Sequence, residues 1–340
     1  MKGLILCAGH GLGLLPFTLR RPKSLVPVAN KPILHYSIHQ LLGANINDIG
    51  IVIGPKGDDI KNIINDYNFP TLYPTFLTQQ KPAGIAAAVA EASDFIGKEP
   101  FVLLLGDNIF AENLSVLTEK FDRASTDAVI LVTCVEKPER FGVAVFNGAR
   151  VNKVIEKPKI PVSNWAITGA YVFGPAIFSA IANITPSWRG ELEITDAIQW
   201  LIANNKNVIP VKTDKWWADA GSLENLLKAN RYLLEKANPP ISLGEDCTIS
   251  NCQLIPPLIV GDRCTLINAT VGPYASIGSD SKLTNVLINN SMLMNNVSLT
   301  NIQPIVCHSI IGSNVDISHV NTSGDLKLIL GDYCKFTCLT

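Results

Sequence analysis

The chain has 340 residues, of which 47% are hydrophobic and 17% are charged. This length predicts two domains rather than one small core, and the composition argues against long disordered regions. Lys and Arg total 28 and Asp and Glu total 29, which gives a net charge of −1. A duplex nucleic-acid binder must neutralise phosphates, so we expect no nucleic-acid partner.

The eight cysteines include no Cys-x-x-Cys pair, and the five histidines do not lie near them at zinc-binding spacing. We interpret the cysteines as reduced thiols of a cytoplasmic protein. The apolar run before Cys7 is far shorter than a signal peptide requires, and a strand explains it better. No run of about 18 apolar residues occurs, so we expect no membrane partner.

Residues 1–238 alternate apolar runs with helical patterns, which predicts an α/β domain with a Rossmann-like, mostly parallel sheet and flanking helices. The expected strands are Lys2–Cys7, Asp48–Ile53, Phe101–Leu105, Ala128–Cys134, Val143–Phe146, Val151–Ile155, Ala166–Phe173 and Val208–Val211. The expected helices are Pro32–Leu42, Gly57–Asn65, Gly84–Ser93, Ser115–Arg123, Pro175–Ile184, Ile194–Ala203 and Leu223–Glu235. Ligands of such sheets bind beyond the carboxyl ends of the strands. We therefore expect the turn Gly9–Gly13 and the segment Gly106–Asn108 to share one crevice.

The sequence changes character after Pro240, where helical periodicity stops and short aliphatic-Gly units recur. Gly244, Gly261 and Gly278 lie 17 residues apart, close to three hexapeptides. This period is typical of a parallel β-helix, in which each coil buries its aliphatic side chains on the next. We predict that fold for residues 239–340, with a β-sandwich as the alternative.

The turn Gly9-His10-Gly11-Leu12-Gly13 follows the first expected strand, as anion-binding turns do. By itself the turn is a weak signal. It lacks the Gly-Lys-Ser/Thr of a P-loop, and its glycines occupy every second position, unlike a dinucleotide-binding fingerprint. No charged residue occurs from Gly3 to Leu15.

A longer stretch, LCAGHGLGLLPFTLRRPKSLVPVANKPIL, resembles the signature of the sugar-1-phosphate nucleotidylyltransferases. Further stretches match the same family in order: QQKPAGIAAA, LLLGDN, VEKPERFGVAVF, VIEKP, NWAITGAYVF, RGELEITD and WWADAG. With PYASIGSDSKLTN and LKLILGDYCKF, the whole chain is similar to long-form glucose-1-phosphate thymidylyltransferases, whose C-terminal domain is a left-handed β-helix. The resemblance implies a Mg²⁺-dependent enzyme that joins glucose-1-phosphate to dTTP (or UTP) and releases pyrophosphate. We expect the β-helix to serve oligomerisation or regulation, and the protein to be a homo-oligomer.

The resemblance also implies the charged groups of catalysis. Lys23 would place a point charge on the α-phosphate and the leaving pyrophosphate, although a surface lysine is the alternative. Asp107 and Asp219 would be the two Mg²⁺ ligands, because hard carboxylates suit that ion. The alternative for both carboxylates is helix capping or salt bridging.

The substrate-binding residues follow from the same resemblance. Backbone groups of Leu6, Ala8, Gly9 and Gly11 would lie along the nucleotide, where missing side chains allow close approach. Gln79 and Gly84 would read the base, with a solvated loop as the alternative.

The sugar phosphate would be held by Glu156 and Lys157, and Lys157 would also be catalytic. Gly142, Thr168 and Glu191 would complete that pocket. The alternatives here are an exposed charge pair, ordinary turn glycines and the entry of a helix.

The glycine turn departs from the family pattern Gly-x-Gly-Thr-Arg-Leu, because Leu12 and Gly13 replace the threonine and the arginine. An arginine that clamps a phosphoryl transition state accelerates the reaction roughly 10³–10⁵-fold. Turnover would then be slow, or Arg20 or Arg21 would supply the charge. Two non-standard alternatives stay open: a catalytically degenerate sensor or scaffold, and an acyltransferase that uses His308 or His319.

Overall fold

The structure is a computed structural model that describes residues 1–55, 57–67, 69, 72 and 74–337. The chain divides into two compact units, Met1–His10 with Leu34–Asp219, and Gly11–Ile33 with Ala220–Thr340. The predicted ranges 1–238 and 239–340 separate the chain where the β-helix strands begin. The compact units instead group residues 11–33 with the β-helix. Within the described ranges, no helix has both the length and the apolar composition needed to cross a membrane.

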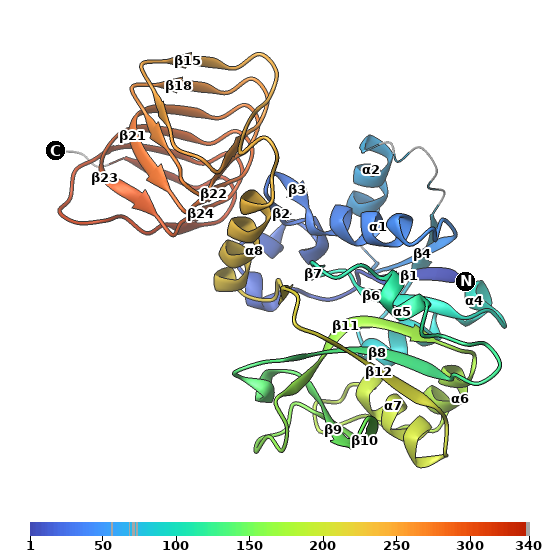
Figure 1. Ribbon diagram of the computed structural model, residues 1–340. Coiled ribbons are helices and arrows are strands. Elements are labelled where there is room, and N and C mark those ends of the chain that lie inside the picture. Colours follow the sequence, from blue (N-terminus) through green and yellow to red (C-terminus); the bar gives the residue numbers. More distant parts are fainter. Residues whose placement is uncertain (56, 68, 70–71, 73, 338–340) are drawn as a thin grey trace. The chain divides into compact units, whose positions relative to one another are not determined.

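The first unit is built on a nine-stranded mixed sheet with the main order β10-β9-β11-β6-β1-β4-β5, in which β8 also pairs with β11 and β12 pairs with β8 (Figure 1). Its strands are β1 (Lys2–Leu6), β4 (Ile49–Ile53), β5 (Thr75–Thr78), β6 (Phe101–Leu105), β8 (Ala128–Cys134), β9 (Gly142–Asn147), β10 (Arg150–Glu156), β11 (Trp165–Phe173) and β12 (Val208–Thr213). Strands β6, β1, β4 and β5 run parallel, whereas β11 is antiparallel to β6 and β8. All expected strands are confirmed. Strand β5 is additional, and its half-exposed residues TFLT carry no apolar run.

The helices of this unit are α1 (Ile33–Gly43), α2 (Asp58–Asp66), α3 (Ile85–Ala90), α4 (Ser93–Ile96), α5 (Ser115–Thr118), α6 (Ala176–Ala182) and α7 (Ile194–Ala203). The single helix expected over Gly84–Ser93 is wrong, because the chain turns at Ala92 and forms α3 and α4. The helix expected over Ser115–Arg123 ends early. There the Asp122 side chain accepts hydrogen bonds from Ala124 N and Ser125 Oγ and closes a turn instead.

The core of the first unit consists of the apolar strands and the helices packed on them. Residues Phe101–Leu104 and Ala128–Val132 are completely buried, as expected for central strands that are covered on both faces. Helix α7 packs on β10 and β12, while α5 packs on β8 and β11. A small antiparallel pair, β7 (Asn108–Phe110) and β13 (Trp217–Asp219), extends beyond β6.

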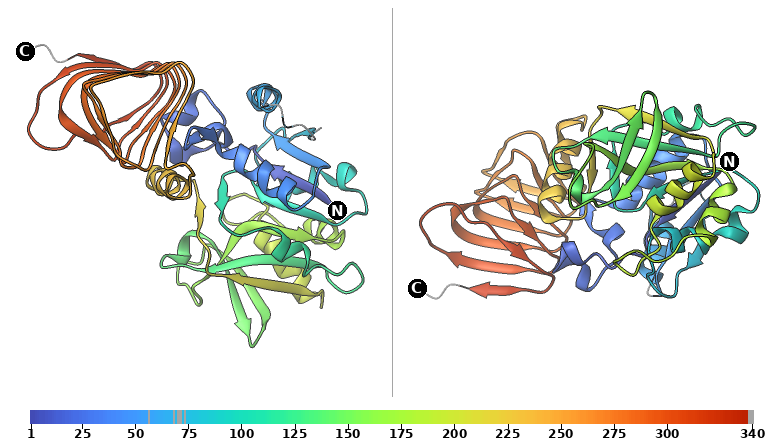
Figure 2. Two further views of the ribbon diagram at one scale, coloured as in Figure 1. Left: turned by 45° about the horizontal axis from the view of Figure 1, so that its top comes forward. Right: turned by 90° about the horizontal axis from the view of Figure 1, so that it is seen from below.

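The second unit contains a parallel β-helix, whose stacked coils are visible in Figures 1 and 2. One sheet contains β14 (Ile241–Leu243), β17 (Leu258–Val260), β20 (Ala275–Ile277), β22 (Met292–Leu293), β24 (Ile310–Ile311) and β26 (Ile329–Leu330). The other contains β15 (Thr248–Ser250), β16 (Gln253–Leu254), β18 (Thr265–Ile267), β19 (Thr270–Val271), β21 (Lys282–Asn289), β23 (Ser298–Cys307), β25 (Asp316–Val320) and β27 (Lys335–Thr337). Ile241 pairs with Leu258, and Leu258 with Ala275, which is the predicted step of 17 residues. These parallel ladders confirm the β-helix and exclude the β-sandwich.

An asparagine ladder links successive coils of the β-helix. Asn251, Asn268, Asn285 and Asn301 all have positive φ angles, between 49° and 56°. Their side-chain amides join successive coils through hydrogen bonds of 2.8, 3.1 and 2.6 Å. Asparagine tolerates the left-handed conformation better than other non-glycine residues, so these positions act as chain reversals.

The second unit also contains helix α8 (Leu223–Glu235) and the short strands β2 (Pro27–Val28) and β3 (Lys31–Pro32). The oxygen of the Ser222 side chain accepts a hydrogen bond from Asn225 N and caps α8. The helix expected at Leu223–Glu235 is therefore confirmed at its full length.

Candidate active site

Three segments of the first unit meet at the carboxyl edge of the parallel strands. Cys7 N donates to Val52 O at 2.7 Å, Gly106 N to Leu6 O at 2.9 Å, and Gln79 N to Ile53 O at 2.9 Å. The chain therefore stays hydrogen-bonded to a neighbouring strand as it leaves β1, β5 and β6. Open α/β sheets bind ligands at this edge.

The close approach of the first two segments requires a glycine. A Cβ at Gly106 would lie 2.6 Å from Cys7 Sγ and 2.7 Å from Leu6 O. Ala8 and Asp107 each follow one of these residues by one position, so the structure brings the nucleotide-binding and metal-binding candidates to the same edge.

The two candidate metal ligands lie at the β7–β13 pair: Asp219 ends β13, and Asp107 lies in the turn just before β7. Asp219 is opposite Asn108 in the β7–β13 pair, and Asp107 directly precedes Asn108. Asn108 Nδ2 donates to Asp107 Oδ1 at 2.6 Å, and Trp217 Nε1 donates to Asn108 Oδ1 at 2.6 Å. This chain of hydrogen bonds orients the Asp107 carboxylate.

Two carboxylates fit Mg²⁺, which usually takes one or two protein carboxylates and completes its shell with water and substrate phosphates. The described part of the chain contains no group of three or more His, Cys, Asp or Glu residues arranged to hold a metal. The Asp219 Oδ1 atom is shielded from solvent. Such an atom suits a site that excludes bulk water.

A second group of charges, here termed the Arg189 cluster, consists of Glu156, Lys157, Arg189, Glu191 and Glu193. Arg189 lies at its centre, with its guanidinium 3.7 Å from Glu156, 3.2 Å from Glu191 and 3.2 Å from Glu193. Lys157 Nζ lies 3.5 Å from Glu156 Oε1. The structure thus brings together three predicted residues, Glu156, Lys157 and Glu191.

Gly142 lies beside this cluster. A Cβ at Gly142 would lie 2.5 Å from Thr195 Cγ2 and 3.2 Å from Glu156 Oε2. Thr195 Oγ1 donates to the same Glu156 Oε2 at 2.9 Å. The absence of a side chain at Gly142 therefore leaves room beside a carboxylate that is already oriented.

Burial raises the pKa values of two acids and one tyrosine in this region. Burial, and then the nearby charge of Glu156, raises the pKa of Glu193, and the same two causes raise the pKa of Asp196. Burial also raises the pKa of Tyr171, with smaller contributions from the charges of Glu156 and Asp107. Glu156 of the Arg189 cluster and Asp107 therefore both act on the Tyr171 side chain.

The base-reading candidates differ in what they contact. Gln79 is 4% exposed, and within the described ranges its Nε2 atom has no hydrogen-bond partner. An orphaned buried donor is costly unless a ligand satisfies it. Gly84 has a φ of +105°, and a Cβ there would lie 2.3 Å from Leu192 O. Gly84 therefore allows residues 191–193 to cross the start of α3.

Thr168 has a structural partner. Its hydroxyl donates to Leu131 O at 3.1 Å and the residue is buried in β11. The next residue, Gly169, leaves space for Asn108, whose side-chain atoms would lie 2.9 Å from a Cβ at that position.

Gly11 and Gly13 of the glycine turn belong to the second unit with Lys23, and Gly11 lies close to Lys23. Gly11 has a φ of +66°, and a Cβ at this residue would lie 2.8 Å from Thr18 Cγ2 and 3.0 Å from Lys23 Cβ. Thr18 Oγ1 donates to Gly11 O at 2.8 Å. The segment therefore folds back so that the start of the Lys23 side chain packs on the turn. Gly9 has open space around it, with no atom within 4 Å of its ideal Cβ.

The backbone around Gly13 leaves no room for a side chain. A Cβ at Gly13 would lie 2.2 Å from the backbone oxygen of Gly221, in the turn before α8. We expect Gly13→Arg to fail to raise turnover and to destabilise the protein by about 1–3 kcal/mol, because backbone must move. Thermal unfolding and pyrophosphate release measure the two effects.

Gly43→Ala is the matched control for Gly13→Arg. A Cβ at Gly43 meets no atom within 4 Å, so the melting temperature is expected to stay within a degree or two of wild type. A Gly13→Arg protein that is as stable as wild type and turns over faster would contradict this account of the turn.

Arg20 and Arg21, the expected substitutes for the missing arginine, already have partners in the second unit. Arg21 Nη2 lies 2.6 Å from Asp332 Oδ2, and the Arg20 guanidinium lies 4.8 Å from the centre of the Tyr333 ring. Either residue would have to give up that contact to reach a bound triphosphate.

Comparison with known proteins identifies the family. Residues 2–236 match the family described as Nucleotidyl transferase. This chain belongs to that family. The nucleotidyl transferase is 34% identical over 352 residues to the glucose-1-phosphate thymidylyltransferase of Streptomyces antibioticus, which covers 98% of this chain and 99% of that protein.

Two further relatives match the first two thirds of the chain. The low-salt glycan biosynthesis nucleotidyltransferase Agl11 of Haloferax volcanii is 44% identical over 237 residues, 69% of this chain and 66% of that protein. A Bacillus anthracis protein assigned to the glucose-1-phosphate thymidylyltransferases, crystallised with a sucrose, superposes with a TM-score of 0.63. It is 36% identical and covers 68% of this chain and 94% of its own.

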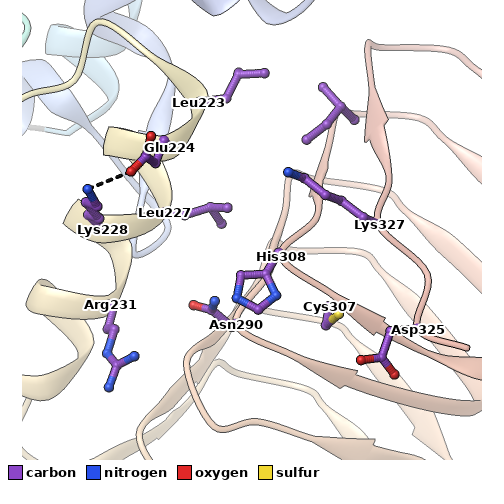
Figure 3. Close-up of a pocket in the computed structure, with 11 residues that line it drawn as sticks. Leu223, Glu224, Leu227, Lys228, Arg231, Asn290, Cys307, His308, Asp325 and Lys327 are labelled. Carbon is purple, nitrogen blue, oxygen red and sulfur yellow. Dashed lines mark ion pairs between the residues drawn. The ribbon is translucent and has the colours of Figure 1, made fainter.

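His308 of this nucleotidyl transferase lines a cavity of about 650 Å³ between α8 and the β-helix (Figure 3). Leu223 and Leu227 give the cavity an apolar wall. Lys228, which also lines it, forms an ion pair with Glu224 at 2.7 Å. The other candidate for acyl transfer, His319, does not line this cavity.

Three residues of this nucleotidyl transferase escaped the sequence prediction: Arg189, Glu193 and Asn108. Arg189 and Glu193 lie within the stretch RGELEITD. An arginine followed by alternating acids is the sequence pattern that could have indicated a charge cluster there. Asn108 follows Asp107 in LLLGDN, yet its role depends on Trp217, which is 109 residues distant. No local sequence pattern indicates the hydrogen bond between Trp217 and Asn108.

Proposed function

We propose that this chain is a Mg²⁺-dependent glucose-1-phosphate thymidylyltransferase, which converts glucose-1-phosphate and dTTP into dTDP-glucose and pyrophosphate. The observation that carries the proposal is the pairing of Asp219 with Asn108, beside Asp107, at the carboxyl edge of the sheet. Similarity over nearly the whole length to the Streptomyces antibioticus enzyme supports the thymidylyl and glucosyl specificities.

Asp107 and Asp219 would hold the Mg²⁺ ion. When bound, the ion neutralises charge on the phosphates and helps to orient them for displacement. Asn108 and Trp217 contribute by fixing the Asp107 carboxylate before any ion arrives, which lowers the cost of ordering it.

In the proposed reaction, a phosphate oxygen of glucose-1-phosphate attacks the α-phosphorus of dTTP. A new P–O bond forms as the bond between the α-phosphorus and its bridging oxygen to the β-phosphate breaks, and pyrophosphate leaves with that oxygen. Lys157 would bind the sugar phosphate and Lys23 the nucleotide phosphates. The protein mainly positions the two substrates and compensates their charge.

Glu156 would accept hydrogen bonds from the sugar hydroxyls in the space beside Gly142. Thr195 and Arg189 hold this carboxylate from two sides, at 2.9 and 3.7 Å. A carboxylate that is oriented in advance loses little entropy when it binds a sugar.

Gln79 would read the pyrimidine edge through its buried amide. Since thymine and uracil share that edge, Gln79→Leu should raise the KM for dTTP and for UTP alike, by roughly 5–10-fold, the value of one or two hydrogen bonds. Steady-state kinetics with both nucleotides measure this effect. An unchanged KM for both nucleotides would remove Gln79 from the base site.

Thymidine and uridine differ by one methyl group, which a pocket distinguishes by about 1–3 kcal/mol. UTP, or another sugar phosphate, is therefore the nearest alternative substrate. Product analysis after incubation with Mg²⁺, each sugar phosphate and each triphosphate tests the proposal. Binding of dTTP without turnover of any pair would instead favour the sensor or scaffold. We also expect a cytoplasmic location and a homo-oligomer, from the cysteine usage and the flat faces of the stacked coils.

A further inference from the structure

The segment Gly11–Ile33, which contains Lys23 and the last three residues of the glycine turn, belongs to the same compact unit as the β-helix. Its first attachment is the ion pair of Arg21 with Asp332, at 2.6 Å. The Asp332 side chain is only 7% exposed, and its second oxygen accepts a hydrogen bond from Ser313 N at 2.8 Å. Arg21 also donates to Ser313 Oγ at 3.3 Å. The carboxylate is thus held on one side by the β-helix and on the other by Arg21.

The neighbouring residues extend this attachment. The Arg20 guanidinium lies over the Tyr333 ring, and a Cβ at Gly331 would lie 3.1 Å from Pro16 Cβ. Three consecutive residues of one coil, Gly331, Asp332 and Tyr333, therefore contact the segment that leads to Lys23.

A second attachment lies after Lys23. Asn30 Nδ2 donates to Ile277 O at 2.7 Å, and Ala29 N donates to Asn230 Oδ1 at 2.9 Å. Asn230, on α8, is 1% exposed and also accepts from Ser276 Oγ of the β-helix. In the sequence, Lys23 therefore lies between two attachments of its segment, and both attachments involve the β-helix.

We infer that Asp332 is a positioning residue for triphosphate binding, acting through Arg21 to hold the segment that carries Lys23. This inference rests on the proposed function. It gives the β-helix a part in holding Lys23, beyond oligomerisation. A buried ion pair that loses one partner leaves an uncompensated charge, so the segment should loosen when Asp332 is neutralised.

The test compares Asp332→Asn with Asp280→Asn. Asp280 belongs to an exposed ion pair with Arg263, at 2.7 and 2.9 Å, within the same β-helix. For Asp332→Asn we expect the dissociation constant of Mg²⁺-dTTP and the KM for dTTP to rise at least about tenfold. The KM for glucose-1-phosphate should stay within about twofold, and Asp280→Asn should match wild type in every constant.

Two further variants separate positioning from loss of folding. The double variant Arg21→Ala/Asp332→Ala should bind dTTP no more weakly than Arg21→Ala, because the two residues act as one pair. Asp332→Glu should recover part of the affinity. A general loss of folded protein would lower kcat for both substrates and leave both KM values unchanged.

Hydrogen exchange of the segment gives a readout that needs no turnover. Faster exchange in residues 11–33 of Asp332→Asn, with wild-type exchange in Asp280→Asn, is the expected result. Unchanged exchange in Asp332→Asn, or unchanged dTTP affinity in a wild type that binds dTTP, would overturn the inference. A wild type that neither binds nor turns over a triphosphate would instead defeat the proposed function.

Discussion

Asp107→Asn and Asp219→Asn are each expected to lower kcat for pyrophosphate release roughly 10³-fold or more. Each substitution removes one anionic oxygen ligand from a site with two carboxylates, and a metal ion stabilises such a transition state by several kcal/mol. The amide keeps the size of the side chain, so the fold should persist. Rates measured over a range of Mg²⁺ concentrations should show that a high concentration restores part of the activity.

Asp214→Asn is the matched control, since Asp214 is an exposed acid five residues before Asp219. It is expected to keep wild-type rates and wild-type Mg²⁺ dependence. Asp107 and Asp219 variants that retain more than a tenth of the wild-type rate would show that the two carboxylates cap or pair structurally rather than bind the ion.

Lys23→Met is expected to lower kcat with dTTP roughly 10³-fold. A cation on the phosphates of the transition state commonly contributes roughly 10³–10⁵-fold. Here the loop arginine of the family is replaced by Gly13, so less charge remains to compensate for a lost lysine. Pre-steady-state measurement of the chemical step separates this effect from weakened binding.

Lys31→Met, in the same segment, provides the control for Lys23→Met. Lys31 is exposed in β3 and is expected to leave kcat unchanged. Lys23→Arg should retain more activity than Lys23→Met, because it keeps the charge. A Lys23→Met enzyme with full kcat would show that the lysine is a surface residue.

The central strands could be predicted from the sequence because each of them is a local run of apolar residues, which is typical of a buried strand. Strand β6 (FVLLL) and strand β8 (AVILVTC) are runs of this kind. Strand β5 could not be predicted in this way, since its residues alternate neither in polarity nor in burial. The β-helix could be predicted for a related reason, because its coils repeat at a period that glycine spacing reveals.

Contacts between residues that are far apart in the sequence could not be predicted, because only folding brings such residues together. Arg21 and Asp332 are 311 residues apart, and nothing near either residue indicates the other. The Gly221 backbone oxygen, which leaves no room for a side chain at Gly13, is likewise far along the chain. Family resemblance identified Glu156 and Lys157, whereas Arg189, which holds their cluster together, required the structure.

Pyrophosphate release from the purified full-length protein, with Mg²⁺, glucose-1-phosphate and each nucleoside triphosphate in turn, tests the central claim most directly. We predict turnover with dTTP, formation of dTDP-glucose, and loss of both when Asp107 or Asp219 is replaced by Asn. No pyrophosphate from any triphosphate, in a protein that is folded and supplied with Mg²⁺, would contradict the account and leave a binding protein built on the nucleotidyl transferase fold.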